Sequence, residues 1–107
     1  MTTKILAYQG QPGAAPAVAF AATTDATIDA ATVCNPTDVG AVLSAWIVPQ
    51  GAAAGDATAL YHELDVAAGA SASLALLVNH AIPRGAEVHL SASAASTLTV
   101  TLSGRAA

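Results

Sequence analysis

Large aliphatic and hydroxyl side chains alternate with a period of two in several segments of this chain. In residues 97–102 the leucines and the valine fall on one parity and the threonines on the other. Residues 87–93 and 71–76 repeat the pattern, with aliphatic or alanine side chains at every second position. A strand gathers such a set on one face, whereas a helix would scatter it around its surface. The alternation therefore predicts half-buried β-strands.

Composition argues for helix, because alanine supplies half of the 54% apolar residues and is the best helix former. Glycines and prolines interrupt the chain too often for long helices, however, and turn signals stand at 35–38, 49–51, 67–69 and 83–85. The segments between them predict further strands at 18–22, 26–34, 39–48 and 59–66. The segment 39–48 is apolar on both parities, which is typical of a central strand. About seven short strands predict an all-β fold, an antiparallel β-sandwich or jelly roll.

The first residues differ from the rest of the chain. Residues 9–16 have few side chains to pack, so residues 1–17 are predicted to form an extended N-terminal arm and residues 18–107 the sandwich domain. Ile5 and Tyr8 are the side chains expected to anchor this arm on a neighbouring molecule. Burying a Leu or Phe contributes roughly 1.5–3 kcal/mol and an alanine much less, so a lone subunit is expected to be only marginally stable. We therefore expect a homo-oligomer.

Charge and composition exclude several classes of protein. Charged residues make up 9% of the chain, with a net charge of −4. Three Lys and Arg residues are too few to neutralise many phosphates, so no nucleic-acid partner is expected. A spanning helix needs about 20 continuous apolar residues, and no such stretch is present, so no membrane association is expected. The single cysteine, Cys34, excludes an internal disulfide and a cysteine zinc knuckle.

Three histidines, His62, His80 and His89, are the first candidates for chemistry, since with nearby carboxylates they could form a metal site. No H-x-H or H-x-x-x-H spacing joins any two of them, so structural roles are preferred, and no metal or other cofactor is predicted. His89 alternates outward with Glu87 and is expected to be exposed. His62 shares its parity with two leucines and is expected to be partly buried. His80 is expected to lie where a strand meets a turn.

Other reactive residues give no catalytic pattern. Cys34 could act as a nucleophile with a histidine base, but it is better interpreted as a small buried apolar residue. Asp25 and Asp29 fit the start of a strand better than a calcium loop. No G-x-S-x-G motif is present, and no enzymatic activity is predicted. Trp46 is interpreted as a core anchor because its neighbours are apolar.

Tyr61 beside His62 is the best candidate for a recognition patch on this chain. The two residues are adjacent in a predicted strand, and together they offer an aromatic ring and an imidazole. With Ile5 and Tyr8 on the predicted arm, they complete the set of four residues proposed to contact partners.

Several turn and strand signatures lie between residues 26 and 104. They are Thr32-Val33-Cys34-Asn35, Trp46-Ile47-Val48-Pro49-Gln50-Gly51, Ala59-Leu60-Tyr61-His62, Val66-Ala67-Ala68-Gly69, Ile82-Pro83-Arg84-Gly85 and residues 98–104. This series resembles small virion structural proteins of tailed bacteriophages, of the head-decoration, neck or tail-associated type. The resemblance implies a β-sandwich without catalytic residues, present in many copies and bound to capsid, neck, tail or fibre proteins. It also implies synthesis in the host cytoplasm and a location in the virion.

Two other classes remain open at this point. A carbohydrate-binding β-sandwich module requires that Trp46 or Tyr61 be exposed. A small cupin-like metalloenzyme requires that two or more histidines converge on one cavity. The virion structural role is the preferred hypothesis, because it needs self-association and no active site.

Overall fold

The computed structural model describes residues 2–107 and places nine β-strands and one short 3-10 helix among them. The strands are β1 (Thr3–Gly10), β2 (Ala17–Ala21), β3 (Ala26–Cys34), β4 (Ala41–Val48), β5 (Ala59–Val66), β6 (Ser71–Ser73), β7 (Ala81–Ile82), β8 (Glu87–Ala92) and β9 (Thr99–Ala106), and the helix η1 covers Asp56–Thr58. No helix within residues 2–107 is long and apolar enough to span a membrane.

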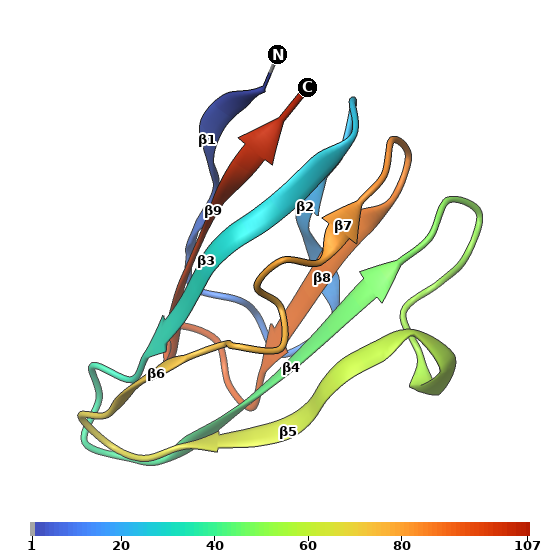
Figure 1. Ribbon diagram of the computed structural model, residues 1–107. Helices are drawn as coiled ribbons and strands as arrows, with labels where there is room; N and C mark the ends of the chain where they lie inside the picture. The colour runs from blue at the N-terminus through green and yellow to red at the C-terminus, as the bar shows by residue number, and fades with distance from the viewer. Residues whose placement is uncertain (1) are drawn as a thin grey trace.

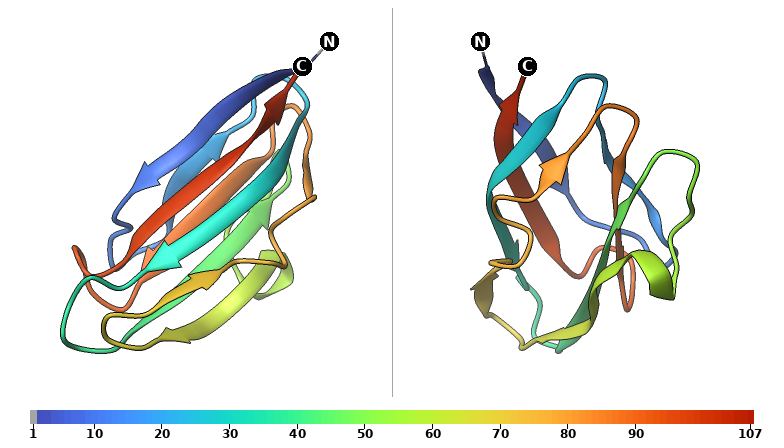
Figure 2. Two further views of the ribbon diagram at one scale, coloured as in Figure 1. Left: turned by 60° about the vertical axis from the view of Figure 1, so that its left-hand side comes forward. Right: turned by 45° about the vertical axis from the view of Figure 1, so that its right-hand side comes forward.

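The strands form two sheets that face each other (Figure 1). Sheet A has the order β1-β9-β3-β6, with β7 also paired to β3, and sheet B has the order β2-β8-β4-β5. Every strand pair in both sheets is antiparallel. Figure 2 shows the two layers from two further sides. The structure thus confirms the all-β, antiparallel sandwich predicted from the alternation.

The alternating aliphatic side chains fill the space between the sheets. On β8, Val88 and Leu90 are buried while the residues between them are partly exposed, and β9 repeats this with Val100 and Leu102. The large side chains that are fully buried come from both layers and their connections: Ile28, Val33, Leu43, Leu74, Leu77, Ile82, Val88, Leu90, Leu98, Val100 and Leu102. Alanine is present in strands despite its helix propensity because the spacing of these larger side chains decides the fold.

The structure differs from the predicted N-terminal arm. Residues 3–10 form β1, which pairs with β9 at the edge of sheet A, from Thr3 opposite Ala106 to Gly10 opposite Val100. An edge strand is held by backbone hydrogen bonds to one neighbour, so it forms even where few side chains can pack. Residues 11–16 then lead the chain across to β2 in sheet B.

The number of strands also exceeds the predicted seven. The two additions are β1 and the two-residue β7, while the strand predicted over 71–76 ends at Ser73. Leu77 N donates to Leu74 O at 3.0 Å, so the chain turns there. Both leucines are fully buried. The turn thus contributes two buried side chains to the core beyond the end of β6.

Asn35 connects three segments at one end of the sandwich. It is fully buried, and its amide nitrogen donates to Val39 O at 2.9 Å and to Val66 O at 3.0 Å. Its side-chain oxygen accepts from the backbone N–H of Thr37 at 3.0 Å and from the Thr37 hydroxyl at 2.6 Å. The predicted turn at 35–38 is therefore present, and it is held by a buried polar group with all its partners.

Candidate interaction site

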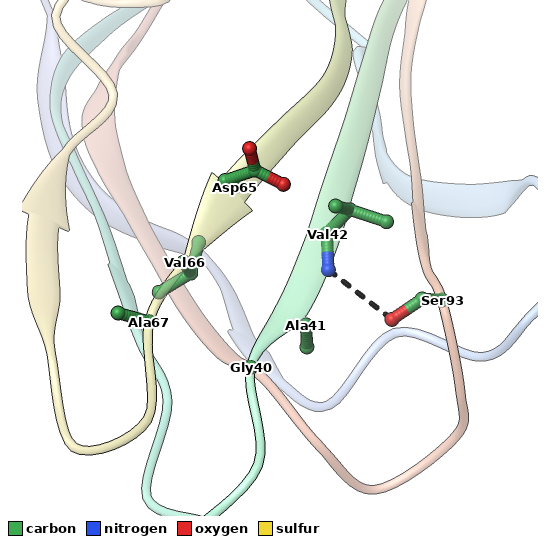
Figure 3. A pocket seen from close by; sticks show the side chains of 7 residues that line it. All are labelled: Gly40, Ala41, Val42, Asp65, Val66, Ala67 and Ser93. Atoms are coloured by element: carbon green, nitrogen blue, oxygen red, sulfur yellow. Dashed lines mark hydrogen bonds between the residues drawn. The ribbon is translucent and has the colours of Figure 1, made fainter.

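A hollow lies at the end of the sandwich where Asn35 is buried (Figure 3). It has a volume of about 430 Å³ and is open to solvent. Its lining residues are Gly40, Ala41, Val42, Asp65, Val66, Ala67 and Ser93. Val42 and Asp65 are opposite each other on β4 and β5, and Val42 N donates to Ser93 Oγ at 3.1 Å.

The lining of this hollow is mostly apolar. Its walls are small aliphatic side chains and backbone, and Asp65 is the ionisable group of the lining. Asp65 is exposed, so its carboxylate remains hydrated. A nucleophile paired with a base is what covalent catalysis needs, and this lining does not contain one.

Tyr61 and His62 differ in their exposure on β5. Tyr61 is opposite Ala45 and packs against the core, and its hydroxyl accepts a hydrogen bond from Leu76 N at 2.9 Å. His62 is exposed, so the prediction that it is partly buried is wrong. The register of β4 and β5 shifts twice here, and Glu63 has φ 55, so the alternation that the sequence shows breaks at this point. A recognition patch at Tyr61 and His62 stays a prediction, with His62 as its more exposed member.

Tyr61→Phe is expected to lower the free energy of unfolding by about 0.5–1.5 kcal/mol, because Leu76 N loses its partner while the ring stays in place. Urea denaturation followed by circular dichroism measures this change. The matched control is Tyr8→Phe, since the Tyr8 hydroxyl has no hydrogen bond to residues 2–107 and its ring also packs against the core. Equal effects of the two substitutions would show that the hydrogen bond between Leu76 N and the Tyr61 hydroxyl does not contribute to stability.

Ile5 and Tyr8 are part of β1 rather than of an arm. Tyr8 is opposite the buried Leu102 and packs against the core, and Ile5 is half-buried opposite Gly104. The predicted arm is therefore wrong, while contact of Ile5 and Tyr8 with a partner stays a prediction. The side chain that β1 exposes is that of Leu6, which is 63% exposed.

The three histidines are dispersed. His62 and His80 are exposed, while His89 lies on the outer face of sheet B with only 15% of its side chain exposed, so the prediction that His89 is exposed is wrong. His89 is covered because Val18 and Trp46 are its neighbours on the adjacent strands. Its Nε2 lies 3.0 Å from Glu87 Oε1. Within residues 2–107, no three His, Cys, Asp or Glu side chains are grouped closely enough to hold a metal ion.

Trp46 is half-buried on the outer face of sheet B, so its interpretation as a core anchor is wrong. Leu43 and Ala45 alternate inward on β4 and are fully buried, which turns Trp46 outward, opposite His89. The central position predicted for this strand is confirmed, because β4 lies between β8 and β5.

The remaining reactive groups have structural partners. Cys34 is half-buried on β3, opposite Thr99. Asp25 Oδ1 accepts from the backbone N–H of Arg84 at 3.0 Å, and Asp29 pairs with Arg105 at 3.0 Å. Asp25 immediately precedes β3, in agreement with its predicted position at the start of a strand.

No family model and no curated protein matches this sequence. The fold is similar to a chain from the structure of infectious bursal disease virus, Gx strain, with a TM-score of 0.56 and 17% sequence identity. The match covers 99% of this chain and 33% of the viral chain, so this chain spans about a third of the length of its structural neighbour. At this identity the likeness establishes the β fold.

Proposed function

We propose that this chain is a non-enzymatic structural component of a virus particle. The observation that carries the proposal is the match of nearly the whole sandwich to a chain from the structure of a virus. In this role the chain binds other copies of itself and other virion proteins. Contacts of this kind add to the stability of the folded chain, because they form only in the folded state.

The surfaces of the sandwich support a role in assembly. The outer face of sheet A carries hydroxyl side chains on adjacent strands, with Thr32 between Thr101 and Ser73. Such side chains are short and uncharged, so a neighbouring backbone can approach without burying unpaired charge. The open hollow beside Asp65, with walls of small aliphatic side chains, offers a second contact area.

Within this class, the turn and strand signatures favour a component of tailed bacteriophages attached to the capsid, neck or tail. The chain is then made in the host cytoplasm and located in the virion. This assignment depends on the sequence resemblance, whereas the broader virion role also has the support of the fold.

The test is the composition of particles produced from the genome that encodes this chain. After density-gradient purification, we expect the chain in the particle fraction at a fixed ratio to the major capsid protein. Electron cryo-microscopy of the same particles is expected to place sandwich-shaped density at symmetry-related positions on capsid, neck or tail. A chain that stays in the soluble fraction would refute the proposal.

A carbohydrate-binding module is the second candidate, favoured by the position of Trp46 on the outer face beside His89 and Glu87. Trp46 is the single tryptophan, so its fluorescence reports directly on this surface. A virion structural protein without a glycan site is expected to show no saturable fluorescence change with soluble oligosaccharides. A saturable blue shift that Trp46→Ala removes would favour the carbohydrate-binding function.

A further inference from the structure

The direction of the backbone groups along β9 can be derived from its pairing with β3. Ala107 N donates to Asp25 O at 3.0 Å, in line with the register of the two strands. In an antiparallel pair, residues that exchange hydrogen bonds alternate with residues that do not. Arg105, Ser103 and Thr101 therefore direct their N–H and C=O groups toward β3, and the residues between them direct theirs toward β1.

The outer edge of β1 consequently carries three residues with free backbone groups. Lys4, Leu6 and Gln9 are opposite the β9 residues that face β3, so their own N–H and C=O groups point away from β9. Because β1 is the last strand of sheet A, no strand of residues 2–107 pairs with them there.

The register with β9 places these residues at regular steps, although their numbers are uneven. Lys4, Leu6 and Gln9 are opposite Arg105, Ser103 and Thr101, which follow each other at steps of two residues. The register shift between Leu6 and Tyr8 absorbs the extra residue. In this register, Lys4 and Gln9 each lie one step from Leu6, on opposite sides of it.

We propose that β1 is a self-association edge, at which a second copy of this chain adds its own β1 in antiparallel orientation about a twofold axis at Leu6. Leu6 then exchanges hydrogen bonds with Leu6 of the second copy, and Lys4 of each copy does so with Gln9 of the other. The two copies of sheet A become one continuous sheet. This inference rests on the proposed function, in which the chain binds copies of itself, and it names the surface involved.

Charge favours a second copy as the occupant. The chain has a net charge of −4, but β1 contains no acidic residue and contains Lys4, one of only three Lys and Arg residues. Copies of an acidic protein repel one another least where they meet through such an edge. Leu6 is 63% exposed in the single chain and loses this exposure to its counterpart in the pair.

The other edges are less suitable for pairing. On β5, two register shifts and the positive φ of Glu63 distort the strand. β6 has three residues and β2 has five, whereas β1 has eight and a single register shift at Ala7. Short edge strands are one way in which proteins avoid unwanted pairing, so β1 is the longest edge without a positive φ.

The first test is sedimentation equilibrium of the purified full chain at micromolar concentration. We expect a dimer that Leu6→Pro and Leu6→Lys convert to monomer, because proline removes the free N–H and lysine places two like charges at the axis. The matched control is Leu76→Lys, at a side chain that is 60% exposed and remote from β1 in sequence. Circular dichroism confirms that each variant is folded. A wild-type monomer, or a dimer that persists in Leu6→Lys, would overturn the proposal.

The second test fixes the register and does not depend on the behaviour of the proline variant. Paired residues that exchange hydrogen bonds have Cα atoms about 5.5 Å apart, within the range that a disulfide bridges. In a Cys34→Ser background, Leu6→Cys is expected to form an intermolecular disulfide on mild oxidation, and Leu76→Cys is not. Equal cross-linking of the two would overturn the twofold register.

These tests use the isolated chain, so they separate the two proposals. A monomer would overturn the β1 pairing while the particle experiment still decides the virion role. A β1 dimer that is missing from purified particles would refute the virion role and leave the pairing intact.

Discussion

Gly104→Ala is expected to lower the free energy of unfolding by about 3 kcal/mol or more, a large share of the stability of a domain of this size. A Cβ atom at Gly104 would overlap the backbone oxygen of Thr27 and lie 3.1 Å from the Cα of Ile28. Both atoms are backbone of β3, which is hydrogen-bonded to β9 at this point. A side chain could rotate away, but here two central strands of sheet A would have to separate.

The measurement is the denaturation midpoint in urea, followed by circular dichroism. The matched control is Gly13→Ala, because a Cβ at Gly13 would meet nothing within 4 Å. We expect this control to unfold near the wild-type midpoint, since alanine there adds no contact and reduces the freedom of the unfolded chain. A Gly104→Ala protein with the same midpoint as Gly13→Ala would show that β3 and β9 are not so closely packed.

The central strands could be predicted from sequence because their side chains carry the signal. On β8 and β9, large aliphatic side chains are needed at every second residue to fill the core, so Val88, Leu90, Val100 and Leu102 mark both strands. The ends of the strands were harder to predict from the sequence. β9 continues through Ser103 to Ala106, where the alternation of large side chains has ended but the backbone still pairs with two neighbours.

The edge strand β1 could not be predicted in this way. Ala7 and Tyr8 pack against the core, but β1 is otherwise held by backbone hydrogen bonds to β9. Such bonds are the same for every residue type except proline and therefore leave little trace in sequence. Register shifts caused the other errors. On β5 they place Tyr61 inward and leave His62 exposed, although strict alternation would give His62 the environment of the leucines.

The hollow beside Asp65 was also not identified from the sequence. Its lining comes from three separate segments, at 40–42, 65–67 and 93, and consists mostly of Gly, Ala, Val and Ser. None of these residue types signals a site by itself. Only the pairing of β4 with β5, together with the Val42–Ser93 hydrogen bond, brings them together.

Asn35→Ala is expected to lower the free energy of unfolding by about 2–4 kcal/mol, because it removes both donors from the carbonyl groups of Val39 and Val66. Asn35 is fully buried, so water cannot reach these carbonyls without opening the end of the sandwich. Urea denaturation measures the loss. A change below the error of the measurement would mean that the network contributes nothing to stability.

Asn35→Asp adds a pH dependence with a definite sign. The new carboxyl would be buried with one oxygen facing the two carbonyl groups, and burial and these dipoles raise its pKa above the usual value of about 3.9. The folded state then holds the proton more tightly than the unfolded state, so stability falls as the pH rises from the unfolded pKa to the folded one. We expect the free energy of unfolding of the variant to be closest to that of the wild type at low pH, where a protonated carboxyl still donates one hydrogen bond. The difference is expected to be largest at neutral pH.

The matched control is Asn79→Asp, at an exposed residue, whose difference in stability from the wild type is expected to change little with pH. If the two variants followed the same pH course, Asn35 would not be buried against the two carbonyl groups.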